Sequence, residues 1–297
     1  MTTELGASGH VAIDPATRMG AVRLTVPDLE RSREFYERVI GLRFYELEDG
    51  SLALGPNAGT PLVELHGDSG AKPLDRRASG LFHVAVLMPS RLDLALALAR
   101  LAQARWPLDG ASDHLVSEAL YLSDPDGNGI EIYRDRPREE WRRTDGQLEM
   151  ATLPLDLDDL LAELRKTDGF QECAPEGTTI GHVHLQVSEL ERTEAFYSQV
   201  LGFDVMVRGY PGALFVSAGG YHHHLGLNTW NSAGSPPPPP GSVGLHSYDI
   251  VLPNAAALEV LLGRIRDAGL DTEPFGDGVL LHDPSGNALV LRTVSGA

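Results

Sequence analysis

Apolar and polar residues follow two different periods within the segment VRLTVPDLERSREFYERVIGLRF, residues 22–44. The first five positions alternate between apolar and polar side chains, which predicts a β-strand with one buried face. From Leu29 to Val39 the apolar side chains recur at helical spacing, so that Phe35, Tyr36 and Val39 share one face. The segment is therefore predicted to be a strand that leads into an amphipathic helix.

The same pattern returns in the second half of the chain as VHLQVSELERTEAFYSQVLGFDV, residues 183–205. Identical residues recur at one constant separation, and the pairs are Leu24/Leu185, Val26/Val187, Leu29/Leu190, Phe35/Phe196, Tyr36/Tyr197 and Gly41/Gly202. Self-similarity at a fixed spacing indicates repeated structural units. The chain is internally duplicated.

Each half also contains a second, weaker copy of the pattern. GLFHVAVLMPS (80–90) matches GLHSYDIVLPN (244–254), and LSDPDGNGIEIY (122–133) matches LHDPSGNALVLR (281–292). This makes four units of roughly 50 residues, called units one to four here. Each unit opens with a strand, continues into a helix and ends in short strands separated by turns, which predicts an α+β fold of four βαβββ modules.

The repeats predict the domain organisation. Units one and two occupy residues 1–135, a polar linker with one helix around 156–166 occupies 136–179, and units three and four occupy 180–297. The run SPPPPPGS (235–242) is predicted to be a loop, because proline lacks the backbone donor that a strand or helix uses. We interpret it as a stiff spacer between units three and four rather than a docking motif.

Composition and charge exclude several functions. The net charge of −18 opposes a nucleic-acid partner, since phosphate binding requires a basic surface. The N-terminal residues lack the apolar core of a signal peptide, and no stretch reaches the roughly 18 apolar residues of a membrane span, so a cytoplasmic location is expected. The single cysteine, Cys173, cannot close an intrachain disulfide. Any metal here must therefore use nitrogen and oxygen ligands.

Three consecutive histidines lie in the apolar stretch GGYHHHLGLNTW, residues 219–230. The stretch is predicted to be the last strand of unit three. Side chains alternate across a strand, so His222 and His224 are expected on one face and His223 on the other.

With these motifs in view, the chain resembles the vicinal oxygen chelate superfamily, which includes glyoxalase I, bleomycin-resistance proteins and type I extradiol dioxygenases. The segments DHLVSEALYLSDPDGNGIEIYRDRP, GHVHLQV and YHHHLGLN are most similar to bacterial catechol 2,3-dioxygenases of the four-module type. The resemblance covers residues 18–294 or nearly so. It implies two barrels, each formed by a pair of modules, and one divalent metal held by a first-strand histidine from each of two modules and a last-strand glutamate.

Transferred position by position, the resemblance implies His83 and Glu131 in unit two and His182 in unit three as the metal ligands. The equivalent positions in the other units are Ala21 in unit one, and Ser247, with His246 one place off, and Val290 in unit four. Pairing units two and three therefore completes a site, while the barrel of units one and four keeps at best Glu64 and His246. An arrangement between subunits would satisfy the same ligand count.

The ligand set has a chemical meaning of its own. Two imidazoles and one carboxylate leave adjacent coordination positions open, which suits Fe(II) and oxygen chemistry, although manganese, zinc or nickel could also bind. A small aromatic diol and dioxygen could then meet at one ion. The predicted activity is extradiol cleavage of catechol or a substituted catechol.

The resemblance also implies roles for residues around the metal. It places the acid–base function on His223, the binding of a substrate oxygen on His114, and a hydrogen-bond donor at Tyr121, ten residues before Glu131. The spacing from His114 to Tyr121 is two residues shorter than in the better-known enzymes of the family. Further candidates for substrate binding are His222, His224, Asn228 and Trp230. Tyr121 and Trp230 could instead be ordinary core aromatic residues.

Two other functions remain open at this stage. A glyoxalase-like isomerase or lyase would use nickel, zinc or manganese with a fourth protein ligand, for which His222 or His224 would serve. A metal-free resistance protein would bind a small molecule and catalyse nothing. The sequence does not specify the oligomeric state, and a homo-oligomer is compatible with it.

Overall fold

The computed structural model describes residues 11–57, 59–144, 147–167, 169 and 171–294. The first ten residues, part of the N-terminal stretch in which the sequence showed no apolar core, lie outside the described residues. Within the described chain, each of the four units has the predicted βαβββ order. Among the described residues, no helix combines the length and apolar character needed to cross a membrane.

Units one and two occupy the first half of the chain. Unit one consists of β1 (Arg18–Val26), α1 (Leu29–Phe35), β2 (Arg43–Glu46), β3 (Leu52–Gly55) and β4 (Val63–Gly67). Unit two consists of β5 (Gly80–Leu87), α2 (Arg91–Ala104), β6 (Gly110–Asp113), β7 (Ser117–Ser123) and β8 (Gly129–Asp135).

Units three and four repeat this order in the second half. Unit three consists of β12 (Thr179–Gln186), α4 (Leu190–Glu194), β13 (Asp204–Val207), β14 (Ala213–Ser217) and β15 (Leu225–Asn228). Unit four consists of β16 (Gly244–Leu252), α5 (Ala255–Asp267), β17 (Glu273–Phe275), β18 (Gly278–His282) and β19 (Ala288–Thr293).

Local sequence explains where the helices begin and end. Asp28 precedes α1 and its side chain accepts a hydrogen bond from the backbone N–H of Arg31, the usual arrangement of an N-cap. The predicted helix continues beyond α1 as the π-helical turn η1 (Tyr36–Ile40) and stops at Gly41, which has a φ of 87°. A π-helical turn also follows α4, as η4 (Ala195–Val200), so the duplication extends to this irregularity.

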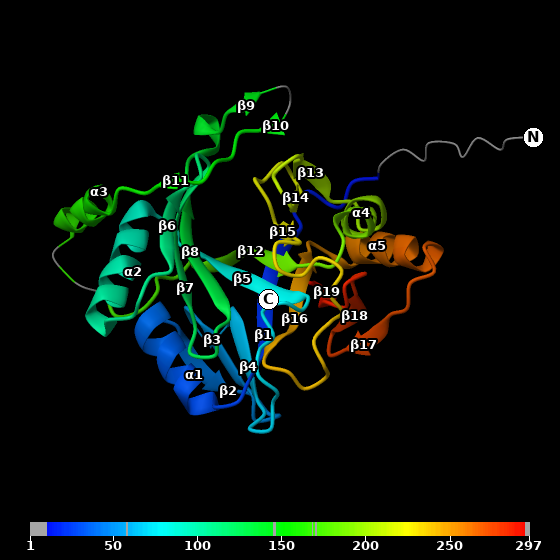
Figure 1. Cartoon of the computed structure of the whole chain (residues 1–297), viewed down its shortest axis with the longest axis horizontal. Helices are drawn as coiled ribbons and strands as arrows, with labels where there is room; N and C mark the ends of the chain where they lie inside the picture. Colours follow the sequence, from blue (N-terminus) through cyan, green and yellow to red (C-terminus); the bar gives the residue numbers. More distant parts are fainter. Residues whose placement is uncertain (1–10, 58, 145–146, 168, 170, 295–297) are drawn as a thin grey trace, which may run out of the picture.

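The strands form two large mixed sheets. One sheet has the order β17-β18-β19-β16-β1-β4-β3-β2 and joins units four and one, while the other has the order β11-β6-β7-β8-β5-β12-β15-β14-β13 and joins units two and three. The first strands pair at the centre of each sheet, β1 with β16 and β5 with β12 (Figure 1). The unit pairing predicted from the ligand count is confirmed, and it is made within one chain.

The helices lie toward the outside of the molecule and the paired first strands toward its centre (Figure 1). In β12, Val183 and Leu185 belong to the main hydrophobic core, whereas the alternating His182 and His184 point to the opposite face of the strand. Both faces of this strand are covered, which is why its histidines are also buried. The strand period thus directs polar side chains into a closed interior.

Residues 136–179 connect the two halves and contribute structure of their own. They contain η2 (Arg138–Glu140), β9 (Arg143–Thr144), β10 (Gln147–Leu148), β11 (Leu153–Pro154), α3 (Leu157–Ala162) and η3 (Glu163–Lys166). Strand β11 pairs with β6 and so extends the sheet of units two and three. The proline run at 236–240 lies outside any helix or strand, as predicted.

Candidate metal centre

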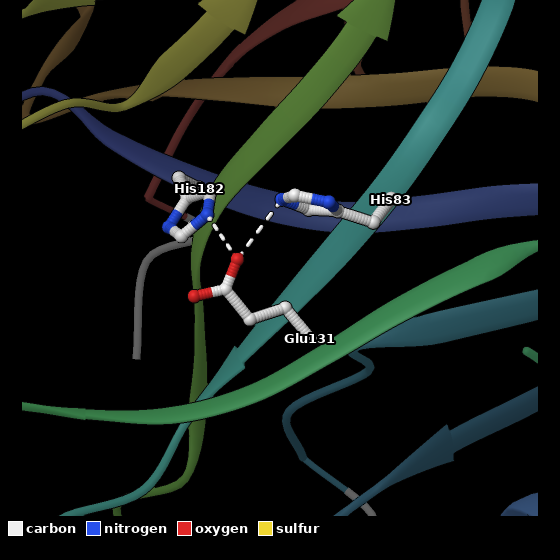
Figure 2. Close-up of side chains that lie close together, drawn as sticks. All are labelled: His83, Glu131 and His182. Carbon is white, nitrogen blue, oxygen red and sulfur yellow. Dashed lines mark hydrogen bonds and ion pairs between the residues drawn. The ribbon is translucent and has the colours of Figure 1, made fainter. Parts of the chain in front are cut away.

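Three buried side chains converge inside the sheet of units two and three. His83 comes from β5, Glu131 from β8 and His182 from β12, and one potential ligand atom from each lies within 4.8 Å of the others. The Glu131 Oε2 atom is 3.0 Å from Nε2 of His83 and 3.2 Å from Nε2 of His182 (Figure 2). The three residues expected from the sequence therefore meet at one point.

Strand register produces this convergence. Strand β12 runs antiparallel to β5, with His184 opposite His83, and β8 runs parallel to β5, with Glu131 beside Ala85. The turn before β8 is held by Asp124, whose carboxylate accepts hydrogen bonds from the backbone of Asp126 and Asn128. This Asp-Pro-x-Gly-Asn turn fixes the point at which the strand carrying Glu131 begins.

The donor set fits a divalent metal ion. Burial lowers the pKa of His182 to about 4, so its ring is neutral near pH 7 and can offer a lone pair. The buried Nε2 atom of His83 has no hydrogen-bond partner with good geometry among the described residues, although Glu131 lies close to it. Neutral imidazole nitrogens and a carboxylate that face one another are the ligands expected of iron, manganese or zinc.

A cavity of about 290 Å³ opens beside these residues. Its lining residues are Phe82, His83, Ser112, His114, Ser117, Tyr121, Glu131, Met150, Ala151, Thr152, His184, Tyr210, Phe215, His223 and Trp230. The described lining residues include no lysine or arginine, and several are aromatic. The cavity is therefore suited to an uncharged, flat molecule with one polar end directed at the histidines and Glu131.

His114 and Tyr121 lie together in this cavity. The Nδ1 atom of His114 is 2.6 Å from the carbonyl oxygen of Ala151, and its Nε2 atom is 2.6 Å from the Tyr121 hydroxyl. Because the carbonyl can only accept, the neutral form of His114 that fits these contacts donates through Nδ1 and accepts at Nε2 from Tyr121. Burial and the nearby Glu131 raise the pKa of Tyr121 well above 10, so the hydroxyl keeps its proton.

The expected alternation of the three histidines is wrong. They lie in a bend that precedes β15, where the period of a strand does not apply. His222 contacts Asp135 through Nε2 at 2.8 Å and His223 through Nδ1 at 2.7 Å. The Nδ1 atom of His224 accepts a hydrogen bond from the backbone N–H of Ala218.

Of the triplet, His223 is the residue that lines the cavity, and its ring centroid is 4.1 Å from that of His182. The expected substrate contacts of His222, His224 and Asn228 are not supported, because their side chains face other partners. The Asn228 side chain accepts a hydrogen bond from the backbone N–H of Trp230. Trp230 does line the cavity, and its indole donates to the carbonyl oxygen of Pro211.

His184 is a cavity residue that the sequence analysis did not single out. It follows His182 by two positions on β12 and is 4% exposed, and its ring centroid lies 4.8 Å from that of His83. The period of two along the motif GHVHLQV was the available signal, because it places both histidines on one face. Gly226, opposite on β15, leaves room for the ring, since a Cβ there would lie 2.8 Å from its Cγ atom.

The sheet of units one and four carries a different cluster at the equivalent place. Arg23 on β1 lies opposite Ser247 on β16, and the equivalent pair in the other sheet is His184 opposite His83. Asp249 lies beside Val290, and the equivalent pair is Ala85 beside Glu131. The Arg23 guanidinium, 3% exposed as a residue, is 2.7 Å from Asp249 and 2.8 Å from Glu64. The Glu64 carboxylate thus forms a salt bridge with Arg23.

The other residue expected to survive in that barrel, His246, stacks on His66 with ring centroids 5.0 Å apart. Its unit-four neighbours at the ligand positions are Ser247 and Val290, which supply no imidazole or carboxylate. The salt bridges of Arg23 with Asp249 and Glu64 therefore occupy the place that the proposed metal ligands occupy in the other sheet.

Comparison with known proteins agrees with this description. Residues 13–132 and 179–291 match the model of the Glyoxalase/Bleomycin resistance protein/Dioxygenase superfamily. The chain is 43% identical over 290 residues to catechol-2,3-dioxygenase of Bacillus subtilis (strain 168), which covers 95% of this chain and 99% of that protein.

Solved structures show the same fold at low sequence identity. Glyoxalase I from Zea mays superimposes with a TM-score of 0.54 at 18% identity, covering 93% of this chain and 92% of that one. The cppA protein from Streptococcus pneumoniae TIGR4 gives a TM-score of 0.54 at 12% identity, covering 93% and 99%. The chain belongs to the glyoxalase/bleomycin resistance protein/dioxygenase superfamily.

Proposed function

We propose that this protein is an Fe(II)-dependent extradiol dioxygenase that cleaves the ring of catechol or a substituted catechol with dioxygen, in the cytoplasm. The observation that carries the proposal is the convergence of His83, Glu131 and His182 in a buried site beside an apolar cavity. Two histidines and one carboxylate with open positions are the ligand set of non-haem Fe(II) oxygenases. The 43% identity to a catechol-2,3-dioxygenase supports the same reaction.

The metal would be held by His83 and His182 through nitrogen and by Glu131 through oxygen. When bound, Fe(II) supplies a place where the diol and dioxygen meet and a route for electrons from one to the other. The chain itself must bind the diol, accept its proton and exclude water.

Residues around the cavity are suited to these tasks. His223 lies against His182 and is the proposed acid–base residue. His114 and Tyr121, joined by a hydrogen bond, are proposed to contact an oxygen of the substrate. Since the Tyr121 proton is directed at His114, we propose that Tyr121 acts as an acceptor rather than the donor expected from the sequence, because its phenolic oxygen has lone pairs with which to accept from a substrate hydroxyl.

The aromatic lining of the cavity explains the expected choice of substrate. Phe82, Phe215 and Trp230 present aromatic surface to the ring of a bound diol. The absence of arginine and lysine among the described lining residues leaves a carboxylate without a partner. Catechols with uncharged substituents are therefore the proposed substrate class.

The experiment is to purify the protein under nitrogen, load it with Fe(II), add catechol and then admit air. The ring-opened semialdehyde is yellow, so an increase in visible absorbance is expected. Zinc-loaded protein is the matched control and should stay colourless. Absence of colour with catechol and with several alkyl catechols would reject the proposal.

Metal analysis of the protein as purified separates this function from the two alternatives: iron supports the dioxygenase, zinc a glyoxalase-like isomerase, and no metal a metal-free binding protein. A glyoxalase-like isomerase needs a fourth protein ligand, but His222 is bonded to Asp135 and His224 to Ser217 and Ala218. This arrangement favours the oxygenase. A protein that binds its small molecule equally well after His83→Ala would instead be a metal-independent binding protein.

A further inference from the structure

We propose that Ser112 and Ser117 form a polar subsite that binds an uncharged, oxygen-bearing substituent on the side of the substrate ring away from the diol. The substituent would carry a hydroxyl or a carbonyl group. This inference rests on the proposed dioxygenase function and narrows its substrate class. Both serines would be substrate-binding residues, and neither would take part in ring cleavage.

Both serines line the cavity beside the proposed metal ligands. Ser112 is 8% exposed and Ser117 is 3% exposed, so bulk solvent hardly reaches either residue. Among the described residues, neither hydroxyl forms a hydrogen bond, and neither oxygen belongs to the polar atoms that protein fully encloses. The two hydroxyls are therefore open to the cavity, and the chain leaves their hydrogen-bonding capacity unused.

These two serines differ from the rest of the interior. Every other buried serine of the described chain has a side-chain hydrogen bond, as Ser232 has with the carbonyl oxygen of Val187. Buried polar groups are normally satisfied, and an exception calls for a partner outside the chain. Both exceptions among the serines line the same cavity, which points to a ligand as that partner.

Strand register places the two hydroxyls near each other. Ser112 of β6 lies opposite Ala119 of β7, and Ser117 lies two positions before Ala119 on the same strand. Residues two apart on a strand share a face, and diagonal neighbours of this kind lie about 7–8 Å apart. One oxygen atom of a ligand can therefore lie between the two hydroxyls and contact both.

The register also separates this subsite from the proposed metal ligands. Tyr121 of β7 lies opposite Glu131, whereas Ser117, four positions earlier, lies opposite Asp135. At about 3.3 Å per residue, the backbone of Ser117 is roughly 13 Å from that of Tyr121. A diol bound beside Glu131 therefore turns the opposite side of its ring, where a substituent begins, toward the serines.

The chemistry of the subsite selects the kind of substituent. An apolar group would remove water from the serine hydroxyls and give no hydrogen bond in return, which costs free energy. A hydroxyl or carbonyl oxygen compensates for that loss, because serine can both donate and accept. A carboxylate would be without a cation, since the described lining residues include no lysine or arginine.

The first test compares probes of equal size. 4-(Hydroxymethyl)catechol and 4-ethylcatechol have the same number of non-hydrogen atoms, and so do 4-(2-hydroxyethyl)catechol and 4-propylcatechol. Calorimetric titration of the full chain loaded with Zn(II), which should not cleave the ring, gives the Kd of each probe. We expect the hydroxyl-bearing member of at least one pair to bind roughly tenfold more tightly. Equal or weaker binding of this member in both pairs would overturn the proposal.

The second test removes each hydroxyl in turn. In Ser112→Ala and in Ser117→Ala, the preference for the hydroxyl-bearing probe should fall roughly fivefold, whereas the Kd of its alkyl partner should change little. With Fe(II)-loaded protein, the loss should appear in KM rather than in kcat, because the serines do not touch the diol. Circular dichroism establishes that both variants are folded. A preference that survives in both variants would overturn the proposal.

Ser123→Ala is the matched control. Ser123 also lies on β7, but its hydroxyl is 2.8 Å from Asp109, and it is not among the lining residues of the cavity. This variant should keep the wild-type preference, and loss of the preference here would overturn the proposal. Preferential binding without ring cleavage by Fe(II)-loaded protein would reject the proposed function and support the subsite. Ring cleavage without the preference would reject the subsite alone.

Discussion

The Nε2 atom of His182 lies 3.2 Å from Oε2 of Glu131, although His182 belongs to the second half of the duplicated chain and Glu131 to the first. The contact depends on the pairing of β12 with β5, which places a strand of unit three inside the sheet of unit two. Each half alone lacks a complete ligand set at these positions. The candidate metal site is therefore a product of the duplication as a whole.

Replacing a proposed ligand should release the metal. Replacing a residue that only orients a metal ligand typically lowers the metal affinity 10- to 100-fold. Replacing a ligand itself, as in Glu131→Gln and His182→Ala, should therefore lower the affinity for Fe(II) by roughly 100-fold or more. Iron content after dialysis and the Kd for Fe(II) measure this. Ser247→Ala, at the position equivalent to His83 in the other sheet, is the control and should retain full metal. Equal metal content in all three variants would contradict the assignment.

Removing Arg23 should destabilise the protein without affecting the metal site. Arg23→Ala removes the guanidinium that pairs with the largely buried Glu64 and leaves the buried Asp249 with Arg292 alone, 3.1 Å away. Loss of one partner of a buried pair typically costs about 3–5 kcal/mol. Guanidinium chloride unfolding measures the loss, and iron content per folded molecule should be unchanged. A loss below about 1 kcal/mol would show that the cluster is solvated.

Stability should decrease as pH falls below about 6.5, the pKa of histidine in an unfolded chain. Burial lowers the pKa of His224 to about 3, so between these values the unfolded chain binds a proton that the folded one does not. The stabilisation is complete above pH 6.5 and is lost progressively toward pH 3, at about 1.4 kcal/mol per pH unit for each such histidine.

Urea unfolding of the metal-free protein at pH 7 and pH 5 tests this expectation. His224→Asn is the matched variant, because its amide oxygen can accept the Ala218 N–H that Nδ1 accepts now. Its stability should depend less on pH than that of the wild type, by about 1.4 kcal/mol per unit. Identical slopes for the two proteins would contradict the prediction.

Adding a methyl group at Gly226 should displace His184. The new Cβ would lie 2.8 Å from Cγ of the imidazole, which must move toward the cavity. Overpacking of this kind costs roughly 1–3 kcal/mol, and the KM for catechol should rise as the cavity narrows. Thermal unfolding and steady-state kinetics measure the two effects. Gly110→Ala is the control, since a Cβ there meets no heavy atom within 4 Å.

The sequence by itself determined the four βαβββ units, because strand and helix periods are local properties and the repeats reinforce one another. Through the family resemblance that its motifs carry, it also pointed to His83, Glu131 and His182 as a set. Equivalent positions in repeated units occupy equivalent places on their strands, so counting imidazoles and carboxylates at the ligand positions that the resemblance implies was enough to predict which units pair.

Only the tertiary structure decided the directions of the three consecutive histidines. Their segment lies in a bend, where each ring follows its own partner: Asp135 for His222, the cavity for His223, and Ser217 for His224. These partners lie on strands distant in sequence or in loops, and no local period encodes them.

Tertiary structure also decided what closes the cavity and what fills the second sheet. Met150, Ala151 and Thr152 come from the segment between the halves, which looked like a plain linker because its strands are only two residues long. The partners of Arg23 come from β4 and β16, far apart in the sequence. Such contacts depend on how strands register across a sheet, and a chain that is read one segment at a time does not reveal that register.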